Sequence, residues 1–179
     1  MKMQKLIIEA AINESWNSKA DNPNIPYTAE EIAADTYDCA EAGASIIHFH
    51  NRDEQGEEVL DDPQEWIKTV SMIREKSDVI VCPSYYNREP ADGFNAEALK
   101  SWDSFVSDPW IKPEITGVCP FNQDMFGPHY WPGERKFDQP KSYIMDFLTF
   151  LNDRKVKPIV ITWEVGHIRE MLAYLHYGL

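Results

Sequence analysis

Two histidines one residue apart form the pattern in this chain best suited to chemistry, because neutral imidazole is a common ligand of divalent metals. They end the apolar run Ser45–His50. Successive side chains of a strand point to opposite faces, so His48 and His50 share one face while Ile47 and Phe49 share the other. Converging imidazoles would supply two of the about three protein ligands that catalytic metal sites use. The alternative interpretation is a pair of polar residues on a half-buried strand, hydrogen-bonded to neighbours or to water.

Composition indicates a globular protein without nucleic-acid or membrane partners. The 179 residues are 43% hydrophobic and 12% aromatic, which suits one α/β domain over residues 1–179. A net charge of -13 and a pI near 4.7 repel phosphate backbones and anionic lipids. Apolar runs are shorter than the ~18 residues that cross a bilayer, and no signal pattern is visible, so we expect a cytoplasmic protein. The three widely spaced cysteines predict reduced thiols.

Hydrophobic periodicity predicts alternating strands and helices. The predicted strands are 5–12, 45–50, 78–83, 114–118 and 158–163. Thr28 and Glu31 have the spacing of a capping box, and Asp62 followed by Pro63 has that of an N-cap and a first helical residue. Gly43 supplies a stop for the first of these helices. Further helices are predicted at 95–102, 144–151 and 168–175, and a long loop at 119–139.

The predicted strands are continuous apolar runs with little alternation, which is typical of a parallel sheet buried on both faces. Two architectures fit the five strand-helix units: a five-stranded doubly wound sheet, or the first five units of a TIM (β/α)8 barrel. Periodicity does not separate them. In both architectures, ligands bind at the ends of strands, where His48 and His50 stand.

Several segments keep the order of a known family along the whole chain. They are Ala10–Ile12, Asn24–Ile32, Ala40–Asp53, Lys112–Glu114, Lys157–Pro158 and Glu164–His167. In these segments the chain resembles the beta-keto acid cleavage enzyme family, and the block 40–53 is the most specific. The resemblance implies a TIM barrel with a divalent metal, usually Zn²⁺. It also implies acyl exchange between a beta-keto acid and acetyl-CoA, which releases acetoacetate and a new acyl-CoA, in a homo-oligomeric enzyme.

The resemblance assigns His48 and His50 as metal ligands. Its third ligand is a glutamate of a late strand beyond residue 179, so we expect the domain to be incomplete at its C-terminus. Arg52 and Asp53 follow the histidines directly and are predicted to support the catalytic site, or else to pair with each other. Glu164, at the end of the fifth predicted strand, is the best stand-in within the chain for an oxygen ligand, or else it caps the next helix.

Two residues are candidates for substrate binding. Ser84 matches a serine in the family loop that receives the substrate carboxylate, although two tyrosines follow it here where the family has small residues. Glu14 is a second candidate, or a solvated loop carboxylate. The acid that some family members use to hold a substrate amine falls nearer Trp16.

The leading hypothesis is therefore a zinc-dependent acyltransferase that cleaves a carbon-carbon bond with acetyl-CoA as co-substrate. Another metal-dependent barrel enzyme, an aldolase or a hydrolase, would use the same histidines. A third hypothesis is a non-catalytic fragment of a barrel that dimerises through its open edges.

Overall fold

The structure is a computed structural model that describes residues 5–14, 17–59, 62–84, 103–118, 123–127, 131–137, 141–162 and 165–178, with the backbone alone at 123–127, 131–137 and 143. Strands and helices alternate along most of it. Their order is β1 (Glu9–Ala11), α1 (Ala29–Glu41), β2 (Ile46–Phe49), α2 (Pro63–Lys76), β3 (Ile80–Pro83), β4 (Ile115–Val118), β5 (Gln123–Gly127), β6 (Trp131–Phe137), α4 (Lys141–Asp153), β7 (Lys157–Val160) and α5 (Val165–His176). The predicted helix at 95–102 lies outside the described residues.

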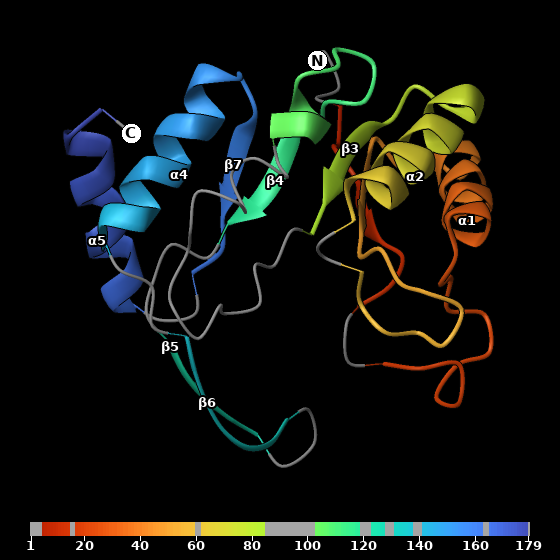
Figure 1. Cartoon of the computed structure of the whole chain (residues 1–179), viewed down its shortest axis with the longest axis horizontal. Helices are drawn as coiled ribbons and strands as arrows, with labels where there is room; N and C mark the ends of the chain where they lie inside the picture. The colour runs from red at the N-terminus through yellow and green to blue at the C-terminus, as the bar shows by residue number, and fades with distance from the viewer. Residues whose placement is uncertain are drawn as a thin grey trace.

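The parallel strands follow one another in chain order (Figure 1). β1, β2 and β3 form one parallel sheet, in which His48 lies opposite Ala11 on one side and Cys82 on the other. β4 and β7 form a second parallel pair. β4 lies beside β3, and the Thr116 hydroxyl donates to the carbonyl oxygen of Pro83 over 3.0 Å. The α/β class with parallel strands is thus confirmed.

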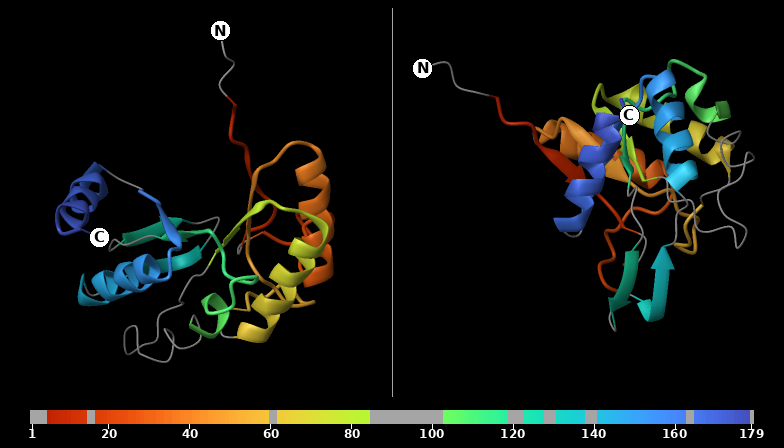
Figure 2. Two further views of the ribbon diagram at one scale, coloured as in Figure 1. Left: turned by 90° about the horizontal axis from the view of Figure 1, so that it is seen from above. Right: turned by 90° about the vertical axis from the view of Figure 1, so that its left-hand side faces the viewer.

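The helices cover the strands in two pairs. α1 packs against α2, and the left view of Figure 2 shows the parallel strands lying between this pair and the pair α4 and α5. The face of β2 that carries Ile47 and Phe49 is fully buried in the core. There the Phe49 ring lies 5.9 Å, between centroids, from the ring of Trp66 on α2. None of the described helices combines the length and the apolar character that crossing a membrane requires.

The two predicted helix caps are confirmed in detail, whereas α4 and α5 each begin three residues before the predicted starts at 144 and 168. The Thr28 hydroxyl accepts from the backbone N–H of Glu31, and the Glu31 carboxylate accepts from that of Thr28, both over 3.3 Å. The Asp62 carboxylate accepts from the N–H of Gln64 over 2.9 Å at the start of α2. Gly43 follows α1 with a φ of +106°, a conformation that glycine adopts without strain.

The predicted first strand is too long. Only Glu9–Ala11 pairs with β2, and the side chain of Leu6 is 82% exposed. Glu9 lies opposite Ile46, the first residue of β2, and the carbonyl oxygen of Ile8 accepts from the N–H groups of Ser45 and Ile46, which is as far as the ladder extends before Glu9.

The predicted loop at 119–139 contains an antiparallel hairpin, β5 and β6, which projects from the remainder of the chain in Figure 1. The ladder shifts register between Phe126 and Gly127. Its segments show no apolar alternation, and Pro132 lies within β6, so neither period nor propensity indicated a strand. The hairpin is held by backbone pairing, which leaves little trace in the sequence.

Replacing Thr28 by alanine removes one half of the capping box at the start of α1. We expect Thr28→Ala to lower the free energy of unfolding in urea by about 1 kcal/mol. The control is Thr149→Ala, an exposed residue in the interior of α4 whose hydroxyl bonds only to its own helix at Met145, and whose loss should cost less than about 0.5 kcal/mol. Equal losses in the two variants would contradict the capping role.

Candidate metal centre

At the end of β2, successive side chains point to opposite faces of the sheet, as the sequence predicted. Ile47 and Phe49 are fully buried against the helices. The imidazoles of His48 and His50 meet edge to face, with ring centroids 5.3 Å apart. Two potential metal ligands therefore stand together at the carboxyl end of a central parallel strand.

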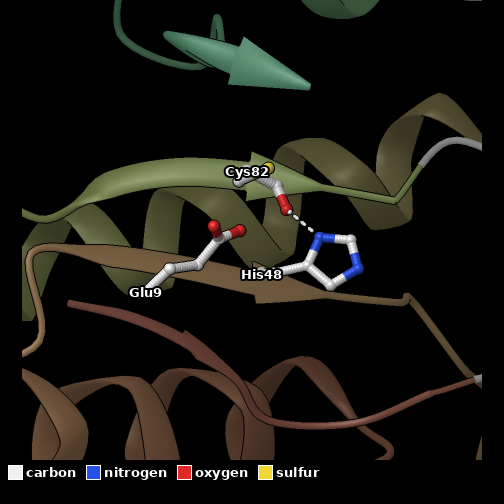
Figure 3. Close-up of side chains that lie close together, drawn as sticks. All are labelled: Glu9, His48 and Cys82. Atoms are coloured by element: carbon white, nitrogen blue, oxygen red, sulfur yellow. Dashed lines mark hydrogen bonds between the residues drawn. The ribbon is translucent and has the colours of Figure 1, made fainter. Parts of the chain in front are cut away.

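The ring of His48 is oriented by the neighbouring strand. Its Nδ1 lies 2.9 Å from the backbone carbonyl oxygen of Cys82 on β3, the dashed contact in Figure 3. A carbonyl oxygen can only accept, so Nδ1 carries the proton and Nε2 keeps its lone pair. His48 is thereby held in the tautomer that binds a metal through Nε2.

The ring of His50 lies between two carboxylates. Its Nδ1 is 2.6 Å from Oε1 of Glu58, and its Nε2 is 3.3 Å from Oε2 of Glu14. The side chains of His50 and Glu58 are 4% and 6% exposed, whereas that of Glu14 is 32% exposed. Glu58 thus forms a carboxylate-histidine pair of the kind that supports metal ligands, while Glu14 occupies the open side of the ring.

The charges of the cluster are mutually dependent. Burial opposes a charge on His50, but hydrogen bonds to Glu14 and Glu58 outweigh it and raise the pKa of His50. Burial and the adjacent His50 lower the pKa of His48. Burial also opposes ionisation of Glu14, but the two histidines outweigh it and lower the pKa of this carboxyl. The cluster therefore attracts a cation, and a proton on His50 competes with a metal ion for that place.

A tight turn after β2 brings Glu58 back to His50. Arg52 and Glu58 form an isolated antiparallel bridge, and the N–H of Gly56 donates to the carbonyl oxygen of Asp53 over 2.9 Å. Gly56 has a φ of +86°, and a Cβ there would lie 2.5 Å from the ring of Tyr27. Only glycine fits this turn. The sequence pattern missed Glu58 because its approach depends on packing against a residue of a distant loop.

Arg52 and Asp53 make their contacts in the loops around the histidines. The buried guanidinium of Arg52 donates to the carbonyl oxygens of Glu14, Asn17 and Gly56 over 2.8, 2.7 and 2.7 Å. The Asp53 carboxylate accepts two backbone N–H groups of its own turn. The observed contacts of both residues shape the loops, and their catalytic roles remain predictions.

Asn13 joins the loop after β1 to the end of β2, and sequence reasoning overlooked it. Its side-chain oxygen accepts from the N–H of His50 over 2.7 Å. Its side-chain nitrogen donates to the carbonyl oxygens of His50 and Pro26 over 2.9 and 2.8 Å. The residue is 3% exposed. Asn13 therefore fixes the backbone of its neighbour Glu14 beside His50.

Ser84 is a further predicted site residue that the structure describes. Ser84 is buried directly after β3, and its N–H donates to the carbonyl oxygen of Phe49 over 2.7 Å, so it stands at the same end of the sheet as the histidines. Glu164 and Trp16 lie outside the described residues.

Two sets of potential metal ligands are present among the described residues, and both contain His48. In each set the ligand atoms all lie within 4.8 Å of one another. One set is Glu14, His48 and His50; the other, drawn in Figure 3, is Glu9, His48 and Cys82. Burial and the nearby Glu9 raise the pKa of the Cys82 thiol to about 12, so it holds its proton, whereas a metal binds the thiolate. The set with two imidazoles is therefore the better site for a divalent ion.

The hydrogen bond from His50 to Glu58 predicts a role for Glu58 in metal affinity. Glu58→Gln removes the negative charge that orients His50 and makes it more basic. We expect affinity for Zn²⁺, measured by competition with a chromophoric chelator, to fall about 10- to 100-fold. Glu57→Gln, at the exposed neighbouring residue, is the control. A Glu58→Gln protein that binds Zn²⁺ as tightly as the Glu57→Gln protein would contradict this role.

Comparison with known proteins supports the fold and identifies a family. The chain is 32% identical over 177 residues to the 3-keto-5-aminohexanoate cleavage enzyme of Fusobacterium nucleatum subsp. nucleatum, covering 98% of this chain and 59% of that enzyme. It is 33% identical over 78 residues, 44% of this chain and 27% of the relative, to the 3-oxoadipate:acetyl-CoA acetyltransferase of Cupriavidus necator. The apo structure of ObcA superposes with a TM-score of 0.61 at 16% identity, over 77% of this chain and 30% of ObcA.

The chain thus spans somewhat more than half the length of the Fusobacterium enzyme. A model of one family matches nearly all of it, over residues 5–179. The chain therefore belongs to the beta-keto acid cleavage enzyme family.

Proposed function

We propose that the protein is part of a metal-dependent enzyme that exchanges the acyl group of a beta-keto acid with acetyl-CoA and releases acetoacetate and a new acyl-CoA. The observation that carries this proposal is the pair His48 and His50, oriented beside a carboxylate at the end of a parallel strand. The family supports carbon-carbon cleavage with acyl transfer. The name of the Cupriavidus relative supports acetyl-CoA as the co-substrate.

We also propose that the chain forms the first five units of a TIM barrel. The observed order places β2 between β1 and β3, and β4 beside β3. A doubly wound sheet instead reverses its order next to β1. On α5, the side chains of Ile168, Leu172 and Leu175 are 46%, 57% and 60% exposed, which supports further chain packing against this helix.

The residues at the strand ends suit this chemistry. His48 and His50 would hold the ion through Nε2, since each Nδ1 is bonded to the protein. A bound Zn²⁺ or similar divalent ion supplies a Lewis acid for the keto oxygen, whose charge grows as the carbon-carbon bond breaks. Glu58 keeps the proton on Nδ1 of His50. Arg52 holds the backbone of Glu14 beside the site.

Substrate would bind at the same end of the sheet. Ser84 is proposed to receive the carboxylate of the beta-keto acid, because it directly follows β3, the strand next to the histidines. Glu14, Asp53 and Glu164 are proposed to act in substrate binding and catalysis as the sequence predicted. The cytoplasmic location and the homo-oligomeric state remain predictions.

Metal content and product release test the proposal together. The purified chain should contain about one divalent ion by elemental analysis, and His48→Ala/His50→Ala should contain none. The metal-loaded chain, incubated with a set of beta-keto acids and acetyl-CoA, should release acetoacetate, and the double variant should release none. Circular dichroism of both proteins controls for folding.

The outcomes distinguish the remaining hypotheses. Metal binding with cleavage that needs no acetyl-CoA would indicate an aldolase or hydrolase that uses the same histidines. A folded chain that binds no metal would contradict the proposal and favour a non-catalytic fragment.

A further inference from the structure

We propose that Tyr27 is a positioning residue of the metal site, because its ring supports the turn that carries Glu58 to His50. This proposal rests on the metal site of the proposed function and extends that site to a residue of a different loop. Tyr27 directly precedes the N-cap residue of α1 and is 5% exposed. Its effect on a bound ion passes through the turn and through Glu58.

The turn after β2 is held at its base and at its tip. At the base, Arg52 and Glu58 form an isolated antiparallel bridge. At the tip, the N–H of Gly56 donates to the carbonyl oxygen of Asp53 over 2.9 Å. A two-stranded ladder this short is marginally stable by itself. The turn therefore needs support at its tip if Glu58 is to keep a fixed distance from His50.

The ring of Tyr27 supplies that support. A Cβ added at Gly56 would lie 2.5 Å from Cε2 and 2.9 Å from the hydroxyl oxygen of Tyr27, so the tip of the turn rests directly on the ring. The guanidinium of Arg52 lies 4.3 Å from the ring centroid, which is the distance of a cation–π interaction. The same guanidinium donates to the carbonyl oxygen of Gly56 over 2.7 Å. The ring thus contacts both the tip and the arginine that holds the tip.

Tyr27 is itself fixed, as a residue that supports a site must be. Its hydroxyl oxygen accepts from the backbone N–H of Lys19 over 2.7 Å, and the Lys19 ammonium lies 4.8 Å from the ring centroid. The N–H of Tyr27 donates to Oε2 of Glu31 over 2.8 Å. Lys19 Nζ donates to the other oxygen of that carboxylate over 2.6 Å. The ring is therefore anchored to the start of α1 and to the loop after β1.

The contact between Glu58 and His50 is sensitive to a shift of the turn. Oε1 of Glu58 lies 2.6 Å from Nδ1 of His50. A displacement of about 1 Å takes such a pair beyond hydrogen-bonding distance. A smaller side chain in place of Tyr27 leaves space beside Gly56, so the turn can move and Glu58 can lose its hold on the imidazole. Tyr27 therefore affects how well His50 is oriented for an ion.

The test is a double-mutant cycle between Tyr27→Leu and Glu58→Ala, with Zn²⁺ affinity measured by competition with a chromophoric chelator. In the otherwise unaltered chain we expect Tyr27→Leu to weaken binding about 10-fold, as residues that act through a ligand do. In the Glu58→Ala chain the same change should cost less than about twofold, because the side chain that the turn delivers is absent.

Two further variants serve as controls. Tyr27→Phe keeps the ring at the tip of the turn and loses only the hydroxyl, so it should bind Zn²⁺ nearly as tightly as the unaltered chain. Tyr37→Leu removes a tyrosine of α1 that is 43% exposed and should leave the affinity unchanged. Circular dichroism of every variant controls for folding.

The outcomes separate this proposal from the proposed function. Equal losses with and without Glu58 would overturn it, since Tyr27 would then act on the fold as a whole. So would a Tyr27→Leu protein that binds as tightly as the Tyr37→Leu protein, or a Tyr27→Phe protein that binds as weakly as Tyr27→Leu. In these cases the metal site itself stands. If the unaltered folded chain binds no metal, the proposed function fails as well.

A second substitution covers the case in which Tyr27→Leu does not fold. Tyr27→Met keeps more of the apolar volume but offers no aromatic face to Arg52. It passes through the same cycle with Glu58→Ala, and a loss confined to the chain that retains Glu58 supports the proposal. Equal losses, or no loss in either chain, contradict it.

Discussion

The pairing of the Asn13 side chain with the backbone of His50 is the interaction on which the site depends. β1 ends at Ala11, and the ladder to β2 continues only as far as the bond from the N–H of Ile12 to the carbonyl oxygen of His48. Beyond it, the side-chain amide of Asn13 forms hydrogen bonds with both the backbone N–H and the carbonyl oxygen of His50. One buried amide, fully hydrogen-bonded, thus sets the distance between the loop after β1 and the end of β2.

The two histidines are prepared for a metal by different acceptors. His48 donates to a backbone carbonyl and His50 to a buried carboxylate. A buried carboxylate costs free energy unless it is paired, so a positive charge close to Glu58 stabilises it. A proton on His50 supplies that charge in the absence of a metal, and a divalent ion supplies it more fully. A bound cation therefore offsets the free-energy cost of burying the Glu58 carboxylate.

Features set by local rules were predictable from the sequence. The two-residue period of strands placed His48 and His50 opposite Ile47 and Phe49, and the capping box at Thr28 marked the start of α1. Glu58 was not predictable, because its approach to His50 needs a turn at Gly56 that packs against Tyr27 from another loop. Asn13 was equally hidden, since a single asparagine in a polar loop carries no periodic signal. The hairpin formed by β5 and β6 was not predicted because its strands lack apolar alternation.

The most direct test of this account is an anomalous difference map from crystals of the chain grown with Co²⁺. We expect one strong peak in contact with Nε2 of His48 and Nε2 of His50, with Glu58 hydrogen-bonded to the far side of His50. A map with both histidines well ordered and no peak between them would contradict it. So would a peak held by Glu9 and Cys82 instead.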